Sequence, residues 1–149
     1  ARQAPDRYVA PTVQRLRLRY AKRGRLRFSS PRDFQRALER ALRRAEVPMA
    51  YSAGFHPHPK VSYANSAPTG VASEAEYVEL GVSATCDPEA VRAALDAALP
   101  EGLDVLDVVE ARTPDFVNRL EASVWRVELP GVPHDRAVAA VTALLAADE

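Results

Sequence analysis

A strict alternation of side chains near the start of the chain most constrains its fold. Residues 13–20 place Leu16, Leu18 and Tyr20 on one side of an extended chain and Arg15, Arg17 and Arg19 on the other. A period of two is typical of a β-strand with one buried face. The sequence therefore predicts a half-buried strand whose polar face carries three arginines. The turn that follows contains Gly24, and we expect a short extended segment at 26–28.

A capped amphipathic helix is predicted next. Ser30 is suited to the N-cap, Pro31 to the first turn, and Asp33 to the acidic position of a capping box. Apolar residues then follow at helical spacing: Phe34, Leu38, Ala41, Leu42 and Ala45. The opposite side of the helix carries an arginine stripe: Arg32, Arg36, Arg40, Arg43 and Arg44. Because a proline disfavours helix in the residue before it, Pro48 ends this helix by Val47.

The remaining elements complete a recognisable order. Strands are predicted at 61–65, 75–83 and 103–109, and a helix capped by Asp87 and ending at Leu99 precedes the last of them. The order over 13–110 is therefore strand, helix, strand, strand, helix, strand. This order is that of the ferredoxin-like split βαβ unit, with four antiparallel strands and both helices on one side. The fold class expected is α+β.

We expect three regions along the chain: a disordered leader at 1–12, the ferredoxin-like unit at 13–110, and an extension at 111–149. In the extension, a polar connector at 111–121 precedes a strand at 123–129 and a helix at 135–147. This is the strand–helix start of a second, similar unit without its later strands. Two explanations are open: the extension packs on the first unit, or the chain has been cut short.

The composition excludes several protein classes. The single cysteine, Cys86, cannot form an internal disulfide, which excludes a disulfide-stapled secreted scaffold. There is no run of 18 apolar residues to cross a membrane, and the N-terminal segment does not have the apolar core of a signal peptide. We therefore expect a cytoplasmic protein.

The balance of 20 basic and 20 acidic residues hides an asymmetry. Residues 13–60 hold 13 basic and 3 acidic side chains, whereas residues 61–149 hold 5 basic and 16 acidic ones. Such asymmetry between halves suggests a charged partner surface, and the basic half suits phosphates. The alternative is that the two halves neutralise each other within the fold, for example through Glu74 and Glu76.

The most unusual segment is a proline-rich loop at 50–60. The prolines and Gly54 exclude regular structure, so we predict an ordered recognition loop comprising Tyr51, Ser52, Gly54, Phe55, His56, Pro57, His58 and Pro59. His56 and His58 are candidate acid/base catalysts. They could also bind a metal, but no Cys-x-x-Cys motif supports one, and we predict no metal site. No phosphate-binding glycine loop, nucleophile elbow or dinucleotide fingerprint is present.

The basic residues form the second candidate site. Clustered arginines are typical of nucleic-acid binding because guanidinium groups pair with phosphates. The residues predicted to contact nucleic acid are Arg15, Arg17, Arg19, Lys22, Arg23, Arg25 and Lys60, and the helix stripe adds to them. The aromatic residues near enough in sequence to stack bases are Tyr20, Phe28, Tyr51 and Phe55. For Tyr20, Phe28 and Phe34, however, a place in the core is expected. A solvated face and a docking surface for an acidic protein are the alternatives.

Several runs resemble a known family. They are Arg-Leu-Arg-Leu-Arg-Tyr-Ala-Lys-Arg-Gly-Arg-Leu-Arg-Phe-Ser-Ser at 15–30, the helix at 33–45, the segment from Pro48 through Gly-Phe-His-Pro-His-Pro-Lys to residue 60, Ala-Pro-Thr-Gly at 67–70, and Ser-Glu-Ala-Glu-Tyr at 73–77. Over residues 13–130 the chain resembles the radical-SAM-associated (radical-SAM-linked) family of uncharacterised bacterial domains. Members occur beside or fused to radical S-adenosylmethionine proteins, and in actinobacteria near a ribonuclease of the E/G type.

The resemblance implies a radical-SAM protein as partner and, with it, RNA modification. Two departures matter: Ser30-Pro31 stands where the family has Ser-His, which weakens a catalytic role, and family members run longer at the C-terminus. The chain has no Cys-x3-Cys-x2-Cys cluster, so it is not itself the iron–sulfur enzyme, and no cofactor is expected. The function expected is that of an accessory module that binds structured RNA or docks a radical-SAM partner. The alternatives are an RNA-processing enzyme using His56 or His58 and a purely protein-docking domain.

Overall fold

The computed structural model describes residues 8–64 and 66–147. By the density of its internal contacts, the chain divides into two compact units, Ala1–Arg119 and Leu120–Glu149. The leader predicted at 1–12 lies outside the described residues up to position 7, and positions 8–12 are neither helix nor strand. None of the helices within the described ranges is long and apolar enough to cross a membrane.

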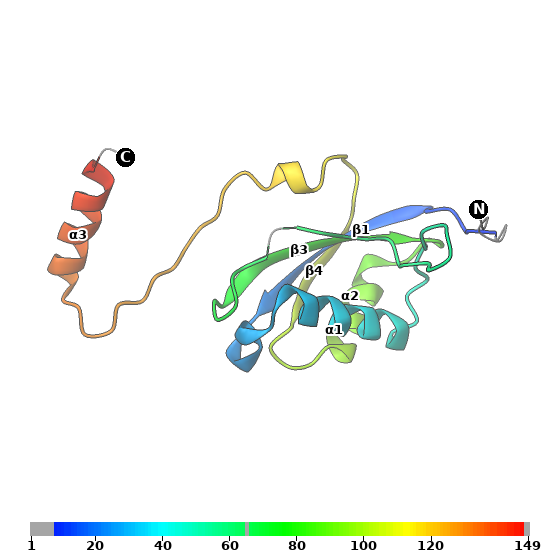
Figure 1. The fold of residues 1–149 in the computed structure, drawn as a ribbon, viewed down its shortest axis with the longest axis horizontal. Helices are drawn as coiled ribbons and strands as arrows, with labels where there is room; N and C mark the ends of the chain where they lie inside the picture. Colours follow the sequence, from blue (N-terminus) through cyan, green and yellow to red (C-terminus); the bar gives the residue numbers. More distant parts are fainter. Residues whose placement is uncertain (1–7, 65, 148–149) are drawn as a thin grey trace. The chain divides into compact units, whose positions relative to one another are not determined.

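The first unit is an α+β arrangement built on one antiparallel sheet, as predicted for the fold class. Its strands are β1 (Gln14–Lys22), β2 (Val61–Tyr63), β3 (Ser73–Val82) and β4 (Val105–Glu110), in the spatial order β2-β3-β1-β4. Helices α1 (Pro31–Arg44) and α2 (Pro88–Ala98) lie on the same face of this sheet (Figure 1). Neither α1 nor α2 lies on the other face, which we call the open face.

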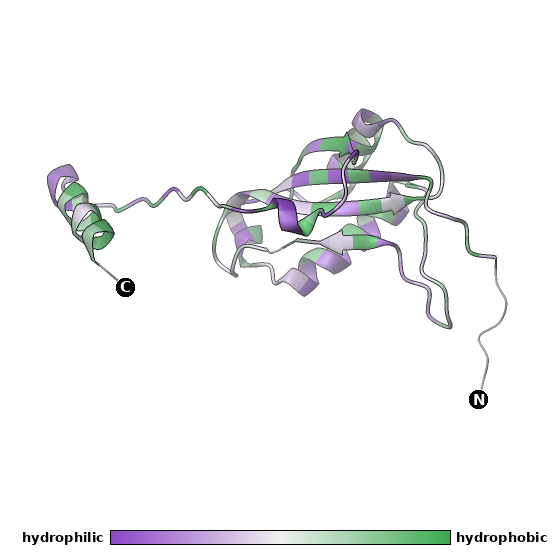
Figure 2. Ribbon diagram, turned by 90° about the horizontal axis from the view of Figure 1, so that it is seen from above, coloured by the Kyte–Doolittle hydropathy of each residue, from purple (hydrophilic) through white to green (hydrophobic). Residues whose placement is uncertain are grey.

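The alternation in β1 determines which residues enter the core. Leu16 and Leu18 are at most 1% exposed and lie opposite Leu80 and Val78 of β3. The same alternation of hydrophobic and hydrophilic residues is visible along the strands in Figure 2. The core between the sheet and the helices is completed by the apolar side of α1 and by Leu95 of α2.

Two aromatic residues expected in the core are found there, and one is not. Tyr20 stacks on Phe34 with their ring centroids 4.0 Å apart, and the edge of Tyr63 lies against Phe34. Burial raises the pKa of the Tyr20 phenol, and it raises that of Tyr63 to about 12, because the charged form is poorly solvated there. The prediction for Phe28 is wrong: its side chain is 59% exposed.

The helix caps agree with the sequence. Ser30 Oγ accepts a hydrogen bond from the backbone N–H of Asp33, and the Asp33 carboxylate accepts one from the Ser30 N–H, which completes the capping box. Asp87 caps α2 in the same way, through the backbone N–H groups of Glu89 and Ala90. The segment 26–28, expected to be extended, belongs instead to a short 3-10 helix, η1 (Gly24–Phe28), which begins at Gly24 with φ +54°.

The second unit contains one regular element, helix α3 (His134–Ala146), close to its predicted range. The strand expected at 123–129 is not formed, and this correction has a simple cause. A β-strand needs a neighbour to receive its backbone hydrogen bonds, and within residues 120–147 no other extended segment is available to pair with it. The connector contains a short 3-10 turn, η2 (Val117–Arg119), and its residues up to Arg119 belong to the first unit.

Candidate nucleic-acid interface

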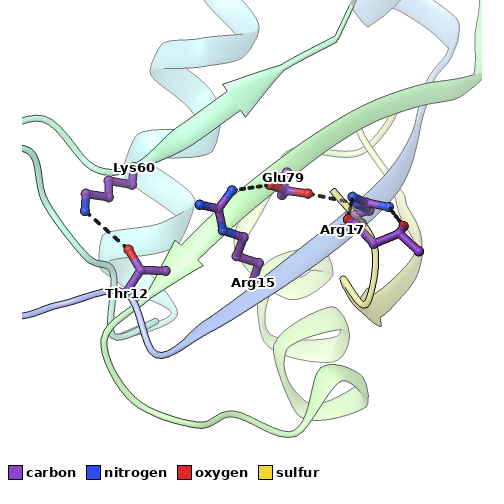
Figure 3. Close-up of polar contacts among 6 residues, drawn as sticks. Thr12, Arg15, Arg17, Lys60 and Glu79 are labelled. Carbon is purple, nitrogen blue, oxygen red and sulfur yellow. Dashed lines mark hydrogen bonds and ion pairs between the residues drawn. The ribbon is translucent and has the colours of Figure 1, made fainter. Parts of the chain in front are cut away.

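The open face of the sheet holds the three arginines of β1, two of which share one buried carboxylate. Glu79 of β3 lies opposite Arg17 in the strand register, and its side chain is 7% exposed. Its two oxygens accept hydrogen bonds from Arg15 Nη1 at 3.1 Å and from Arg17 Nε at 2.8 Å (Figure 3). Both guanidinium groups are therefore compensated by the same carboxylate of the acidic half.

Arg17 is held on its other side by the segment that follows β4. Its Nη1 donates to Thr113 Oγ1 at 3.0 Å, its Nη2 donates to the Thr113 carbonyl oxygen, and its guanidinium lies 5.5 Å from the Phe116 ring centroid. These contacts leave the Arg17 side chain only 16% exposed. An open hollow of about 580 Å³ remains between this segment and the strands, lined by Arg15, Ser62 and residues 111–118 among others.

The next basic residues along the chain also have intramolecular partners. Arg19 forms an ion pair with Asp107 of β4 at 2.6 Å, and Arg23 pairs with Glu74 at 2.7 Å and with Asp104 at 3.1 Å. The pKa of Arg23 is raised, chiefly by its hydrogen bond to Glu74. The pairing expected for Glu74 is thereby confirmed.

Lys22 and Glu76 are buried with backbone partners. The ammonium of Lys22 donates to the carbonyl oxygens of Ala67 and Pro68, at 3.0 and 3.3 Å. The carboxylate of Glu76 accepts from the backbone N–H of Ala67. Glu76 thus holds the turn before β3 and forms no ion pair with the described arginines.

Arg25 and Lys60 are the two predicted contact residues that are exposed and have no ion-pair partner in the part of the chain that the structure describes. Arg25 is exposed on η1. Lys60 is exposed at the other end of the sheet, where its Nζ lies 3.4 Å from Thr12 Oγ1 (Figure 3). The structure therefore divides the seven predicted residues into two groups. Four pair with carboxylates and Lys22 is buried against backbone carbonyls, whereas Arg25 and Lys60 are exposed and form no ion pair with a described residue.

A second basic surface runs along η1 and α1. It consists of exposed arginines that form no ion pair with any described residue: Arg25, Arg27, Arg32, Arg36, Arg40, Arg43 and Arg44. We call these seven residues the α1 arginine surface. Arg27 lies over the exposed ring of Phe28, 4.6 Å from its centroid, and Arg44 donates to the carbonyl oxygen of Ala98 at 3.3 Å. The arginine stripe of this helix could be predicted from the sequence. That its arginines form no ion pairs, in contrast to those of β1, could be seen only in the structure.

The proline-rich loop is closed at its base by hydrogen bonds. Ser52 N–H donates to the His58 carbonyl at 2.8 Å, and His58 N–H donates to Ser52 Oγ at 3.0 Å. Tyr51 and Pro59 form the adjacent backbone bridge. The tip is exposed, with Phe55 at 54%, and Gly54 there has φ +122°, a conformation that residues with a side chain rarely adopt. The loop predicted at 50–60 is therefore present, whereas its role in recognition stays a prediction.

The loop is also tied to the sheet through one glycine. Ala50 N–H donates to the Gly81 carbonyl, Gly81 N–H donates to the Lys60 carbonyl, and Lys60 N–H donates to the Ala50 carbonyl, each at 2.8 Å. A Cβ on Gly81 would lie 3.2 Å from the Lys60 Cβ and 3.2 Å from Thr12 Cγ2. The missing side chain thus allows Lys60 and Thr12 to approach the end of β3.

His56 and His58 carry exposed side chains without hydrogen-bond partners among the described residues. An acid/base catalyst is normally oriented by a second polar group, and the structure places none of the described carboxylates in that role. No group of three or more potential metal ligands occurs within residues 8–64 and 66–147. The catalytic role of these histidines stays a hypothesis.

Comparison with known proteins places the chain in a family without assigning an activity. Residues 15–149 match a family model described as "Uncharacterized protein conserved in bacteria (DUF2344)", which includes both compact units. Neither the curated proteins nor the solved structures gave a match to the chain. The expected membership of an uncharacterised bacterial family is thereby confirmed, whereas the radical-SAM association stays a prediction. The chain belongs to the DUF2344 family of uncharacterized proteins conserved in bacteria.

Proposed function

We propose that this protein is an accessory module that binds structured RNA through the α1 arginine surface. The observation that carries the proposal is the exposure of seven arginines without ion-pair partners among the described residues. An exposed guanidinium that forms no ion pair has its hydrogen-bond donors available for a phosphate. The arginines of the other set, by contrast, already donate hydrogen bonds to carboxylates within the protein: Arg15, Arg17, Arg19 and Arg23.

The spacing along α1 supports contact with a phosphate backbone. Arg32, Arg36, Arg40 and Arg44 recur every four residues, which at 1.5 Å per residue distributes charge over about 18 Å of helix. Residues four apart share a face of the helix, so these side chains project in similar directions. Double-stranded RNA is bound largely through its backbone and shape, which suits a regular row of arginines better than a single deep site.

The exposed aromatic residues supply a second kind of contact. Phe28 is next to the α1 arginine surface in sequence, and Phe55 and Tyr51 are exposed on the proline-rich loop. Aromatic rings stack on unpaired bases, and a loop held by hydrogen bonds loses little entropy on binding. We therefore propose that the loop Tyr51–Pro59 recognises an unpaired part of the RNA.

The architecture and the partner are part of the same proposal. We infer a ferredoxin-like arrangement for residues 13–110, supported by the strand order β2-β3-β1-β4, the antiparallel pairing and the two helices on one face. From the resemblance of the runs at 15–30, 33–45 and 48–60, we propose that the module works beside a radical-SAM protein whose substrate is the bound RNA.

The test is a salt titration of binding to a pool of structured RNAs. For contacts with several phosphates, log K falls linearly with log salt, and each lost contact lowers the slope by about 1. The variant Arg36→Glu/Arg40→Glu should weaken binding strongly and reduce the slope by about 2. The control Arg112→Glu/Arg119→Glu changes the net charge equally on exposed residues outside this surface and should retain most of the affinity.

Two outcomes would overturn the proposal. Equal losses in both double variants would mean that only the net charge matters, and no binding at low salt would exclude an RNA interface. In the second case, nuclease-insensitive co-purification with an acidic partner would favour a protein-docking function. If RNA is instead cleaved or modified by the purified chain, His58→Ala should abolish turnover while binding survives.

A further inference from the structure

The second unit exposes its apolar side chains to an unusual degree. Within residues 120–147, no residue is buried. The exposed large apolar side chains are Leu120, Val124, Trp125, Val127, Leu129, Val132, Val138, Val141, Leu144 and Leu145, with exposures from 40% to 102%. Figure 2 shows hydrophobic residues along α3 as well. A stretch of this kind is expected to be covered by another surface in the functional molecule.

The pattern of residues 123–129 is that of a strand without a neighbour. Trp125, Val127 and Leu129 alternate with Arg126 and Glu128. The ion pair between Arg126 Nη2 and Glu128 Oε1, at 3.1 Å, shows that these two side chains lie on the same side of the extended segment. The segment therefore has one apolar face and one face carrying a single charge of each sign.

A tight turn ends this segment. The N–H of Val132 donates to the Leu129 carbonyl at 3.2 Å, and between them Pro130 precedes Gly131, whose φ is +78°. Proline followed by a glycine with positive φ is typical of a type II turn. The turn sharply redirects the chain before α3, whose residues Val138, Val141 and Leu145 recur on one face.

We propose that residues 123–129 pair in antiparallel register with the same segment of a second copy of this chain, centred on Val127. In this register Arg126 lies opposite the partner's Glu128, and Glu128 lies opposite the partner's Arg126. Trp125 then lies opposite the partner's Leu129, so that one opposite-charge pair and one apolar pair are each formed twice. One two-fold axis generates all these contacts, as in most homodimers.

The charges of Arg126 and Glu128 favour a second copy of the chain as the partner and an antiparallel direction of the paired strands. A parallel, in-register pair would place Arg126 opposite Arg126 and Glu128 opposite Glu128, which is unfavourable. The antiparallel pair is self-complementary without any other protein. The apolar face of the resulting two-stranded sheet is covered by α3 of each copy through Val138, Val141 and Leu145, because two strands alone are only marginally stable. This interface uses no residue of the α1 arginine surface and does not depend on RNA binding.

The test is the oligomeric state of the full chain as a function of concentration, measured by analytical ultracentrifugation. Arg126→Glu and Glu128→Arg each turn both opposite-charge pairs into like-charge pairs and should weaken the dimer by about tenfold or more. The double variant Arg126→Glu/Glu128→Arg should restore it. An equimolar mixture of the two single variants should form a heterodimer, because every facing pair then has opposite charges.

The only tryptophan of the chain supplies an independent signal. Trp125 is 64% exposed in the single chain, and its fluorescence should shift to shorter wavelength as the dimer forms. A chain that stays monomeric at millimolar concentration would overturn the proposal. A dimer that is equally stable in both single variants would also overturn it, because another surface would then be the interface.

Discussion

The open face of the sheet and the α1 arginine surface are both rich in arginine, yet they differ in what surrounds each guanidinium. On the open face, Arg15 and Arg17 share Glu79, and Arg19 pairs with Asp107. On α1, the arginines from Arg32 to Arg44 have no ion-pair partner among the described residues. The comparison teaches that the number of basic residues is a poor guide to a phosphate-binding surface, and that the compensation of each charge is a better one.

Removing the charge of Glu79 should have the largest effect on stability. Glu79→Gln retains the shape but weakens two charge-assisted hydrogen bonds to a buried carboxylate, which costs about 2 kcal/mol of unfolding free energy. Urea denaturation measures this loss, with Glu101→Gln, at an exposed position, as the control. The same variant frees Arg15 and Arg17 and should steepen the salt dependence of RNA binding. A stability loss below about 0.5 kcal/mol would mean that the open face is not held by this carboxylate.

The cap of the helix that carries the uncompensated arginines should have the next largest effect. Ser30→Ala removes the side chain that accepts the Asp33 N–H, at a cost of about 1 kcal/mol. Ser29→Ala, which changes the neighbouring residue outside the capping box, is the matched control. A loss of the same size in both variants would show that the box contributes nothing specific.

The capping box also gives a pH dependence with a defined sign. The hydrogen bond from Ser30 lowers the pKa of Asp33 below its ordinary value of 3.8. Because the folded-state pKa is the lower one, the stabilisation is complete above the unfolded value and is lost as the pH falls through the folded value. Thermal denaturation between pH 6 and pH 2 should therefore show a smaller difference between wild type and Ser30→Ala at the acidic end. An unchanged difference would contradict this assignment.

Neutralising one arginine on each surface should have the smallest effects, and they should differ in sign. Arg19→Gln breaks the pair with Asp107, which is about half exposed, and should cost about 0.5 kcal/mol or less. Arg40→Gln relieves repulsion from Arg36 and Arg44 and should therefore raise the free energy of unfolding, by about 0.2–0.5 kcal/mol. Paired urea titrations measure both changes. A clear loss of stability in Arg40→Gln would mean that Arg40 forms an ion pair on α1, and the two arginine surfaces would then not differ in this respect.

Local patterns in the sequence were enough to predict the four strands and two α-helices of the first unit, but not its short 3-10 helices. The alternation in β1 and the Ser30–Asp33 spacing depend only on near neighbours, so strand, helix and cap could be predicted before any tertiary contact was known. The prediction for 123–129 was wrong because alternation shows that a segment can pair and not that a partner strand is present. Phe28 was misplaced because the turn at Gly24 winds into η1 and directs the ring outward.

The candidate site was only partly predictable for a related reason. Arg17 and Glu79 are separated by 62 positions, and Arg19 and Asp107 by 88. Only the strand register brings each pair together, and that register is not visible in a single sequence. The loop at 50–60 could be predicted because prolines and Gly54 act locally. The choice between the two arginine surfaces needed the positions of the carboxylates.

The triangle of backbone hydrogen bonds joining Ala50, Lys60 and Gly81 has a consequence for how the loop moves. The amides of these three residues are protected by the sheet itself, so their hydrogen exchange requires opening of the sheet. The amides at the tip, around Phe55, exchange without any such opening. The base of the loop is therefore held by the sheet, and a ligand that binds the tip should slow exchange there while the base keeps its protection.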